Sequence, residues 1–157
     1  MKFNCDGALM VKLNFGVAAF VARDSCGNFI DGRSEYFPCS SSFMAEAKAI
    51  KLVIDFASLR SLSRVIIESD CKVVIDVIRG SSSFVEWDLI GILNFIALLT
   101  GTFEVIEFAF ASRSANRVAH WLVFHEKNAI LLKDWFSNIP LELSNILLSD
   151  FEAAGIG

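Results

Sequence analysis

The stretch that decides the fold is residues 43–70, FMAEAKAIKLVIDFASLRSLSRVIIESD. Its first half repeats apolar residues at intervals of three and four from Phe43 to Ala57, which predicts a helix. Its second half, Arg64 to Ser69, is short and rich in β-branched residues, as is typical of a strand. The change between the two patterns predicts a helix followed by a strand, and strands that alternate with helices favour parallel pairing.

The residues before this stretch predict an antiparallel part of the same sheet. Turn residues cluster at 24–28, DSCGN, after an apolar run, and this arrangement predicts a hairpin. Three strands are expected here: residues 1–8 ending at Asp6-Gly7, residues 15–23, and a strand from Phe29 that Pro38 ends.

The residues after this stretch alternate between helical and strand patterns. We expect helices over Cys71–Arg79, Phe84–Thr100 and Asn116 to about Ile130, a strand over Phe103–Phe110, and a turn with a short helix within Trp135–Asp150. This order predicts an α/β fold of the mixed α+β kind, with a five-stranded mixed sheet flanked by helices. A length of 157 residues fits a single domain, with a core to about residue 130 and a C-terminal extension over residues 131–157.

The chain is unusually apolar, with 54% hydrophobic residues and a mean hydropathy of +0.53. Its longest apolar run, Leu89 to Leu99, is shorter than the roughly 20 residues that span a bilayer. Polar residues near the start, among them Lys2 and Asp6, interrupt any signal-peptide core. We therefore expect an intracellular protein with no membrane segment. The four cysteines form no CxxC pair, which argues against a zinc ribbon and predicts free, mostly buried thiols.

The net charge of −4 bears on nucleic-acid binding. Nucleic-acid binders usually carry a basic patch, whereas the 14 basic residues of this chain are scattered along it. The charge therefore counts against tight non-specific binding, and any contact with nucleic acid has to be local or to depend on metal.

Three carboxylates stand at informative places in this predicted fold. Asp6 ends the first strand, Glu46 shares a helix face with apolar residues, and Asp70 follows the fourth strand. A carboxylate that faces a core is costly unless it is paired or bound to metal. If the three converge, a pair of Mg²⁺ ions would neutralise them.

Each of the three also has an ordinary interpretation. Asp6 could be a turn residue before Gly7, and Asp70 could cap the helix that starts near Cys71. Glu46 could be a solvated acid in the first helical turn, where it would suit the helix dipole. The set of three across strand, helix and strand is more specific than any one position.

Five motifs resemble the type 1 ribonuclease H domain, and more narrowly its plant reverse-transcriptase-like group, which is related to retroelement ribonuclease H. The resemblance covers about residues 1–130, and the tail also looks like that group. The motifs are FNCDGA (3–8), VARDSCGNFI (21–30), MAEAKAI (44–50), VIIESDCKVVIDVI (65–78) and ANRVAHWL (115–122).

This resemblance implies the strand order 3-2-1-4-5 and cleavage of the RNA strand of RNA–DNA hybrids by two divalent ions, Mg²⁺ or Mn²⁺. No small-molecule cofactor is expected, and we expect a monomer. The family's acidic set falls on Asp6, Glu46 and Asp70, while His120 stands at its fourth position. The resemblance also implies nucleic-acid contacts by the backbone at Gly7 and by Ser42, and Lys72 could reach a phosphate.

The chain departs from the family pattern at two places. His120 replaces an Asp, and a neutral imidazole suits Mn²⁺ or Zn²⁺ better than Mg²⁺, so ligand and bystander are both open interpretations. Active members often carry a His six residues before Asn116, where this chain has Phe110. Its loss should slow the reaction without abolishing it, since a general acid–base contributes about 10²–10⁴-fold. Lys72 could equally be an ordinary exposed lysine.

The aromatic residues have an interpretation of their own. We expect them to form core contacts and not a base-stacking platform. His125 lies further along the helix, at a spacing that turns it away from the site. The aromatic residues assigned to the core are Phe15, Phe20, Phe95, Phe103, Phe108 and Trp121.

Three functions remain compatible with the sequence. An active hybrid-specific endonuclease is favoured by Asp6, Glu46 and Asp70. A catalytically weakened or inactive nucleic-acid-binding domain, derived from a retroelement ribonuclease H, is favoured by His120, Phe110 and the acidic charge. A protein-interaction domain that keeps the fold for its surface would suit the high apolar content.

Overall fold

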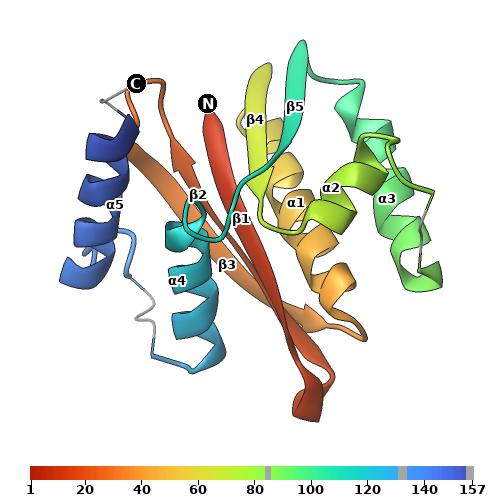
Figure 1. Cartoon of the computed structure of the whole chain (residues 1–157), viewed down its shortest axis with the longest axis horizontal. Helices are drawn as coiled ribbons and strands as arrows, with labels where there is room; N and C mark the ends of the chain where they lie inside the picture. The colour runs from red at the N-terminus through yellow and green to blue at the C-terminus, as the bar shows by residue number, and fades with distance from the viewer. Residues whose placement is uncertain (84–85, 131–133, 155–157) are drawn as a thin grey trace.

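The computed structural model describes residues 1–83, 86–130 and 134–154. Five strands form one mixed sheet in the order β3-β2-β1-β4-β5 (Figure 1), which confirms the predicted fold and strand order. The central strand β1 pairs antiparallel with β2 and parallel with β4, and β5 pairs parallel with β4. The strands are β1 (Lys2–Met10), β2 (Phe15–Arg23), β3 (Phe29–Pro38), β4 (Arg64–Ser69) and β5 (Val105–Phe110).

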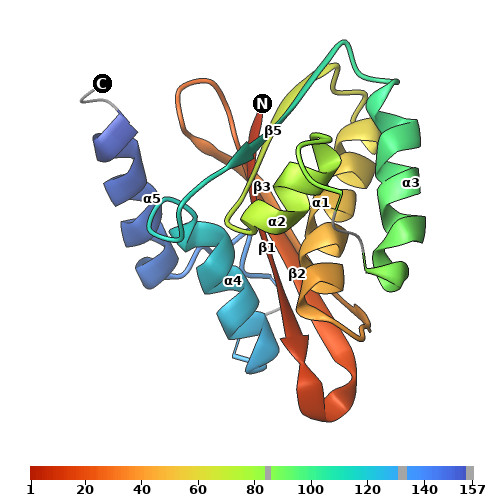
Figure 2. The same cartoon turned by 45° about the vertical axis from the view of Figure 1, so that its right-hand side comes forward.

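Helices cover both faces of this sheet (Figures 1 and 2). One face packs against α1, α2 and α3, and the other packs against α4 and α5. The helices are α1 (Ser42–Leu59), α2 (Lys72–Ile78), α3 (Ile90–Thr100), α4 (Arg117–Lys127) and α5 (Leu141–Ala154), with short 3-10 turns at Val11–Leu13 and Trp87–Leu89. None of the helices in the described ranges is long and apolar enough to cross a bilayer.

Strand β2 explains why residues 15–23 are apolar without alternation. Side chains of a strand point alternately to its two faces. Ala18 and Phe20 therefore enter the core on the α1 side, while Val17 and Val21 enter the core on the α4 side. Both faces of the strand are covered, so nearly every position from Gly16 onward is buried.

Strand β1 is longer than predicted, because Asp6-Gly7 does not end it. The strand continues to Met10, which pairs with Phe15 across the hairpin. Gly7 serves the approach of α1 instead, since a Cβ atom there would lie 2.2 Å from the carbonyl oxygen of Ala45. The glycine thus allows close helix–strand packing in the middle of a strand. In the sequence alone, such a glycine cannot be distinguished from one that marks a turn.

Other boundaries move by a few residues. α3 begins only at Ile90, after a 3-10 turn, and residues 84–85 of the predicted helix lie outside the described residues. β5 begins at Val105, and α5 is longer than the short helix expected in the tail. The division into a core and an extension stays a prediction, although α5 packs through Leu143 into the α4-side core.

The predicted aromatic core is correct except at Phe15 and Phe95. Phe15 is 41% exposed because it stands at the end of β2, where the sheet stops. Phe20 is fully buried, and Trp121 lies in the core between the sheet and α4. The cysteines are free; Cys5 and Cys39 are buried, whereas Cys26 is exposed. Phe103 and Phe108 are half-buried against the core. Phe95 is half-buried but does not belong to the core cluster, and Lys51 Nζ lies 4.3 Å from the centroid of its ring.

Candidate metal centre

Asp6 stands in the middle of the central strand and is 4% exposed. It pairs with Ala19 of β2 and lies one residue past Cys5, where the parallel pairing of β1 with β4 ends. The interpretation of Asp6 as a turn residue is therefore wrong. A buried carboxylate at this place needs a partner or a cation to compensate its charge.

Glu46 reaches the same place from α1. The helix begins after Ser41, whose hydroxyl accepts a hydrogen bond from the Met44 amide at 3.1 Å. The bare Cα of Gly7 then lets the α1 backbone approach β1, and a Cβ atom there would lie only 2.7 Å from the Glu46 nitrogen. Glu46 lies beyond the first turn, half-buried, so it is not the solvated first-turn acid of the ordinary interpretation.

Asp70 follows the last residue of β4. Because β4 runs parallel to β1 with Ser69 beside Cys5, the next residue of each strand lies at the same end of the pair. The cap residue of α2 is Cys71, without a side-chain cap bond, so Asp70 is not the cap. One carboxylate oxygen of Asp6, Glu46 and Asp70 each lies within 4.8 Å of the other two. These three residues are called the acidic cluster below.

The electrostatics of the acidic cluster fit a cation site. Burial, and then the negative charges of Asp6 and Asp70, raise the pKa of Glu46 to about 9. Burial and the charge of Asp70 also raise the pKa of Asp6, against the opposing effect of His120. Close carboxylates cannot all ionise without compensation. The donor set is all oxygen, which is the set that Mg²⁺ and Mn²⁺ prefer.

His120 lies next to this cluster. Its Nδ1 is 3.0 Å from Oδ2 of Asp6, and its side chain is 42% exposed. It is not one of the three groups that lie mutually close, so its contact with the cluster runs through Asp6. Its role as a metal ligand stays a prediction, while the interpretation as an isolated polar residue does not fit this contact.

Asn116 holds the helix of His120 in place, a role that the sequence motif did not reveal. Its Nδ2 donates to the carbonyl oxygen of Cys5 at 2.8 Å, directly before Asp6, and the residue is fully buried. Its main-chain carbonyl oxygen accepts a hydrogen bond from the main-chain amide of His120 at 3.1 Å. Asn116 therefore ties the start of α4 to β1.

Arg113 is a second residue that sequence reasoning missed. It lies in the loop between β5 and α4, and its Nε is 3.7 Å from Oδ2 of Asp70. Its side chain is 73% exposed, so the guanidinium stands at the rim of the cluster and faces solvent. Phe110, at the position where the resemblance leads one to look for His, is exposed at the end of β5. The loop thus brings an arginine to the cluster where no histidine is present.

The three residues predicted to contact nucleic acid lie around the acidic cluster. The structure does not test these contacts. Gly7 is held against α1, and Ser42 is exposed at the first position of that helix. Lys72 is exposed, and its Nζ lies 2.5 Å from Oδ2 of Asp76 one turn along α2. His125 is turned away, since its Nδ1 is 2.9 Å from the Trp121 carbonyl oxygen. The roles of Gly7, Ser42 and Lys72 stay predictions.

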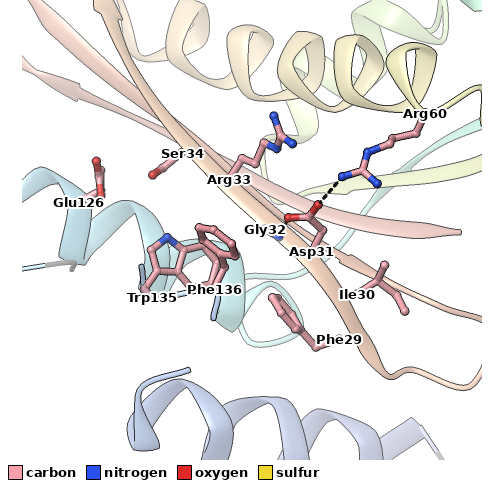
Figure 3. Close-up of a pocket in the computed structure, with 10 residues that line it drawn as sticks. All are labelled: Phe29, Ile30, Asp31, Gly32, Arg33, Ser34, Arg60, Glu126, Trp135 and Phe136. Atoms are coloured by element: carbon pink, nitrogen blue, oxygen red, sulfur yellow. Dashed lines mark hydrogen bonds and ion pairs between the residues drawn. The ribbon is translucent and has the colours of Figure 1, made fainter. Parts of the chain in front are cut away.

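Figure 3 shows a different hollow, of about 680 Å³, beside the edge strand β3. Asp31 and Arg60 form an ion pair across it at 3.4 Å (Figure 3). Trp135 lies over Gly32, where a Cβ atom would come within 2.4 Å of the indole ring. No member of the acidic cluster lines this hollow, so it is not the candidate metal centre.

Comparison with known proteins assigns the chain to a family. The sequence profile described as reverse transcriptase-like matches residues 4–125, more than half of the chain. The chain belongs to the reverse transcriptase-like family. Its fold is that of a type 1 ribonuclease H domain. A search of curated proteins finds no match.

The solved structures similar to this member of the reverse transcriptase-like family share its fold at low identity. Ribonuclease H1 of Halobacterium salinarum NRC-1 has a TM-score of 0.75 at 16% identity, covering 82% of this chain and 97% of its own. The N-terminal ribonuclease H domain of a Mycobacterium tuberculosis protein has a TM-score of 0.73 at 17% identity, covering 82% and 94%. LC11-RNase H1, solved in complex with an RNA/DNA hybrid, has a TM-score of 0.72 at 19% identity, covering 82% and 98%.

Proposed function

We propose that this chain is a metal-dependent endonuclease that hydrolyses the RNA strand of RNA–DNA hybrids. The observation that carries the proposal is the mutual approach to within 4.8 Å of Asp6 on β1, Glu46 on α1 and Asp70, which directly follows β4. The family membership and the hybrid bound to LC11-RNase H1 support the substrate class. Origin in a plant retroelement stays a prediction from the sequence motifs.

Each residue of the site has a proposed role in holding the ions or in orienting another residue. Asp6, Glu46 and Asp70 would hold one divalent ion, and Asp6 with His120 would hold a second. Two such ions supply activation of the attacking water and stabilisation of the leaving 3′-oxygen. Asp6 orients the His120 ring through the contact at 3.0 Å, and Asn116 fixes the helix that carries it. The products would carry a 5′-phosphate and a 3′-hydroxyl.

Selection of RNA would depend on the 2′-hydroxyl, which distinguishes RNA from DNA in the minor groove. The backbone at Gly7 and the hydroxyl of Ser42, which both lie at the junction of β1 and α1, are the proposed contacts. Lys72 is available for a phosphate only if it leaves Asp76, with which it is paired. We therefore assign it the weakest share of substrate binding.

A second candidate is a catalytically weakened or inactive nucleic-acid-binding domain. Its specific support is His120 in place of a carboxylate, together with an exposed Phe110 where a histidine would assist proton transfer. A neutral ligand leaves the charge of a second ion less compensated. This candidate predicts hybrid binding that is retained in the absence of cleavage.

Cleavage of an end-labelled RNA–DNA hybrid, in Mg²⁺ and separately in Mn²⁺, tests the proposal. RNA and DNA duplexes of the same sequence serve as substrate controls. Asp70→Asn removes one carboxylate of the acidic cluster, and Glu68→Gln serves as a control for loss of a nearby acid outside it. The proposal predicts cutting of the RNA strand of the hybrid alone. Cutting in Mn²⁺ only would assign the weakness to His120. A folded protein that binds the hybrid and cuts in neither metal would establish the second candidate instead.

A further inference from the structure

A groove of about 540 Å³ runs along the outer side of α4 and is closed on one side by α5. It begins at the acidic cluster, because two of its lining residues also contact cluster carboxylates. His120 contacts Asp6 at 3.0 Å, and Arg113 lies 3.7 Å from Asp70. A strand that presents a phosphate to the cluster therefore meets the mouth of this groove.

The walls of the groove are aromatic and apolar. Phe124 is 52% exposed, one helical turn beyond His120, and contributes nothing to the core. The ring of Trp121 stacks on His125 with 3.8 Å between centroids, and Ile146 of α5 faces them. The exposed ring of Phe124, beside this largely buried aromatic pair, is a surface on which a nucleic-acid base can stack.

The charges at the mouth of the groove favour an anion. Arg117 is exposed and has no carboxylate partner among the residues that the structure describes. Arg113 has its positive charge mostly in solvent. The one acid in the lining, Glu142, stands at the other end of the groove, where it faces His125 at 3.6 Å. Positive charge therefore adjoins the acidic cluster, and apolar surface lies beyond it.

One residue that lines the groove, Trp121, carries a buried hydrogen-bond donor that lacks a partner among the described residues. Trp121 is 8% exposed, and its Nε1 has no hydrogen-bond acceptor within the described part of the chain. A buried donor without a partner costs about 1–3 kcal/mol relative to a satisfied one.

We propose that this groove binds an unpaired nucleotide of the RNA strand, one that extends past the end of the hybrid, with its base on Phe124 and its phosphate at Arg117. The proposal rests on the proposed function, since it takes the strand at the acidic cluster to be RNA. His120 and Phe124 are one helical turn apart, about 6 Å along the helix axis. That distance corresponds to one or two stacked nucleotides.

An unpaired nucleotide fits better than a duplex because the bases of a duplex are already stacked on each other. Single-stranded ends have free base faces, and proteins recognise them by aromatic stacking together with basic side chains. The groove offers one exposed ring and one unpaired arginine, which suffices for one or two nucleotides.

Fluorescence anisotropy in Ca²⁺, and separately in EDTA, tests this proposal with one hybrid in four forms. The forms are blunt, with a three-nucleotide 5′ overhang on the RNA strand, with a 3′ overhang on the RNA strand, and with overhangs on the DNA strand. Stacking of one base corresponds to about 5- to 100-fold in affinity. We expect at least about fivefold tighter binding with one of the RNA overhangs.

Phe124→Ala and Arg117→Ala should each abolish that gain while leaving affinity for the blunt hybrid within about twofold. Phe136→Ala and Arg79→Ala are the matched controls, since Phe136 is also 52% exposed and Arg79 is an exposed arginine on the far side of the sheet. All four positions are exposed, so thermal melting is expected to stay unchanged.

Equal affinity for blunt and overhang forms, or a gain that survives Phe124→Ala, would overturn the groove proposal. If the blunt hybrid is cut under these outcomes, the proposed function stands and only the groove fails. If instead the protein neither binds nor cuts the blunt hybrid but binds the same RNA single strand in a Phe124-dependent way, the proposed function fails and the groove stands.

Discussion

Two acids at the end of β4, Glu68 within the strand and Asp70 directly after it, have opposite surroundings. Glu68 is fully compensated, because Lys2 Nζ lies 2.9 Å from one carboxylate oxygen and Asn4 Nδ2 donates to the other at 2.8 Å. Asp70, two residues later, faces Asp6 and Glu46, and the one cation near it is the exposed Arg113 at 3.7 Å among the residues described. The charge of Glu68 is compensated by neighbouring side chains of the protein. Asp70 belongs to a group of carboxylates whose charge a bound cation would compensate.

The difference between Glu68 and Asp70 separates a structural acid from a functional one. Carboxylates whose oxygens are used by side chains of the same fold stabilise it without further partners. Carboxylates that lie close together destabilise the protein until a cation binds. Such destabilising groups are expected at sites of binding or catalysis. Glu68 and Asp70 are therefore matched positions for mutation.

The largest expected difference is in catalysis. Asp70→Asn should lower the rate of hybrid cleavage by about 10³-fold or more, since it removes a ligand of the metal that activates water. Glu68→Gln should leave the rate within about threefold. Single-turnover cleavage in Mg²⁺ measures both variants side by side, and equal loss in the two would remove the distinction between these acids.

The next effect concerns the fourth position. His120→Asp restores a carboxylate beside Asp6 and should raise activity in Mg²⁺ by about tenfold relative to activity in Mn²⁺, because the harder ion prefers oxygen ligands. His125→Asp is the control on the same helix, away from the cluster. The ratio of initial rates in the two metals is the measurement. An unchanged ratio for His120→Asp would make the residue a bystander.

Metal affinity should depend on pH with a definite sign. The pKa of Glu46 is raised to about 9 in the metal-free protein, so a proton has to leave when a cation binds. Affinity for Mn²⁺ should therefore rise with pH between about 6 and 8, by up to about tenfold per unit for one proton. Titration at several pH values in buffers of different ionisation enthalpy would detect the released proton. Affinity independent of pH would contradict the raised pKa.

The smallest effects are on stability without metal. Raised folded-state pKa values of Asp6 and Glu46 mean that the folded state binds protons more tightly than the unfolded state. Their contribution to stability is present in full below the unfolded pKa of about 4, and it is lost as pH rises through the folded values toward about 9. The free energy of unfolding should therefore fall as pH rises from 5 to 8 in EDTA.

The two matched acids should shift this free energy in opposite directions. At pH 8 in EDTA, Asp70→Asn should stabilise the fold by about 1 kcal/mol, because it removes a like charge. Glu68→Gln should destabilise it by about 0.5–1 kcal/mol, because it loses the ion pair with Lys2. Urea unfolding of both variants gives the sign. Destabilisation by both would mean that the acidic cluster is a structural network.

The sequence predicted the acidic cluster but not what surrounds it. Asp6, Glu46 and Asp70 stand out because a carboxylate at a strand or on an apolar helix face breaks the local pattern. Asn116 and Arg113 break no local pattern. The contact of Asn116 joins residues 111 positions apart, and the contact of Arg113 depends on the path of an irregular loop. Such contacts exist only once the sheet and α4 are packed.

The same limit explains the errors in the fold. The sequence pattern predicts a strand end at Asp6-Gly7 because glycine commonly marks turns, whereas Gly7 allows the α1 backbone to approach the middle of β1. Phe15 was assigned to the core from its place in an apolar run, but the sheet ends beside it. Strand order and element types depend on patterns along the chain, while edges and close approaches depend on neighbours far away in sequence.

Calorimetric titration of Mn²⁺ into the metal-free protein distinguishes a metal centre at the acidic cluster from a structural group of acids. If Asp6, Glu46 and Asp70 form a metal centre, the unmodified protein and Glu68→Gln should bind Mn²⁺ with the same affinity, and Asp70→Asn should bind it at least about tenfold more weakly. Absence of binding to the unmodified protein, or equal binding by all three proteins, would contradict the account.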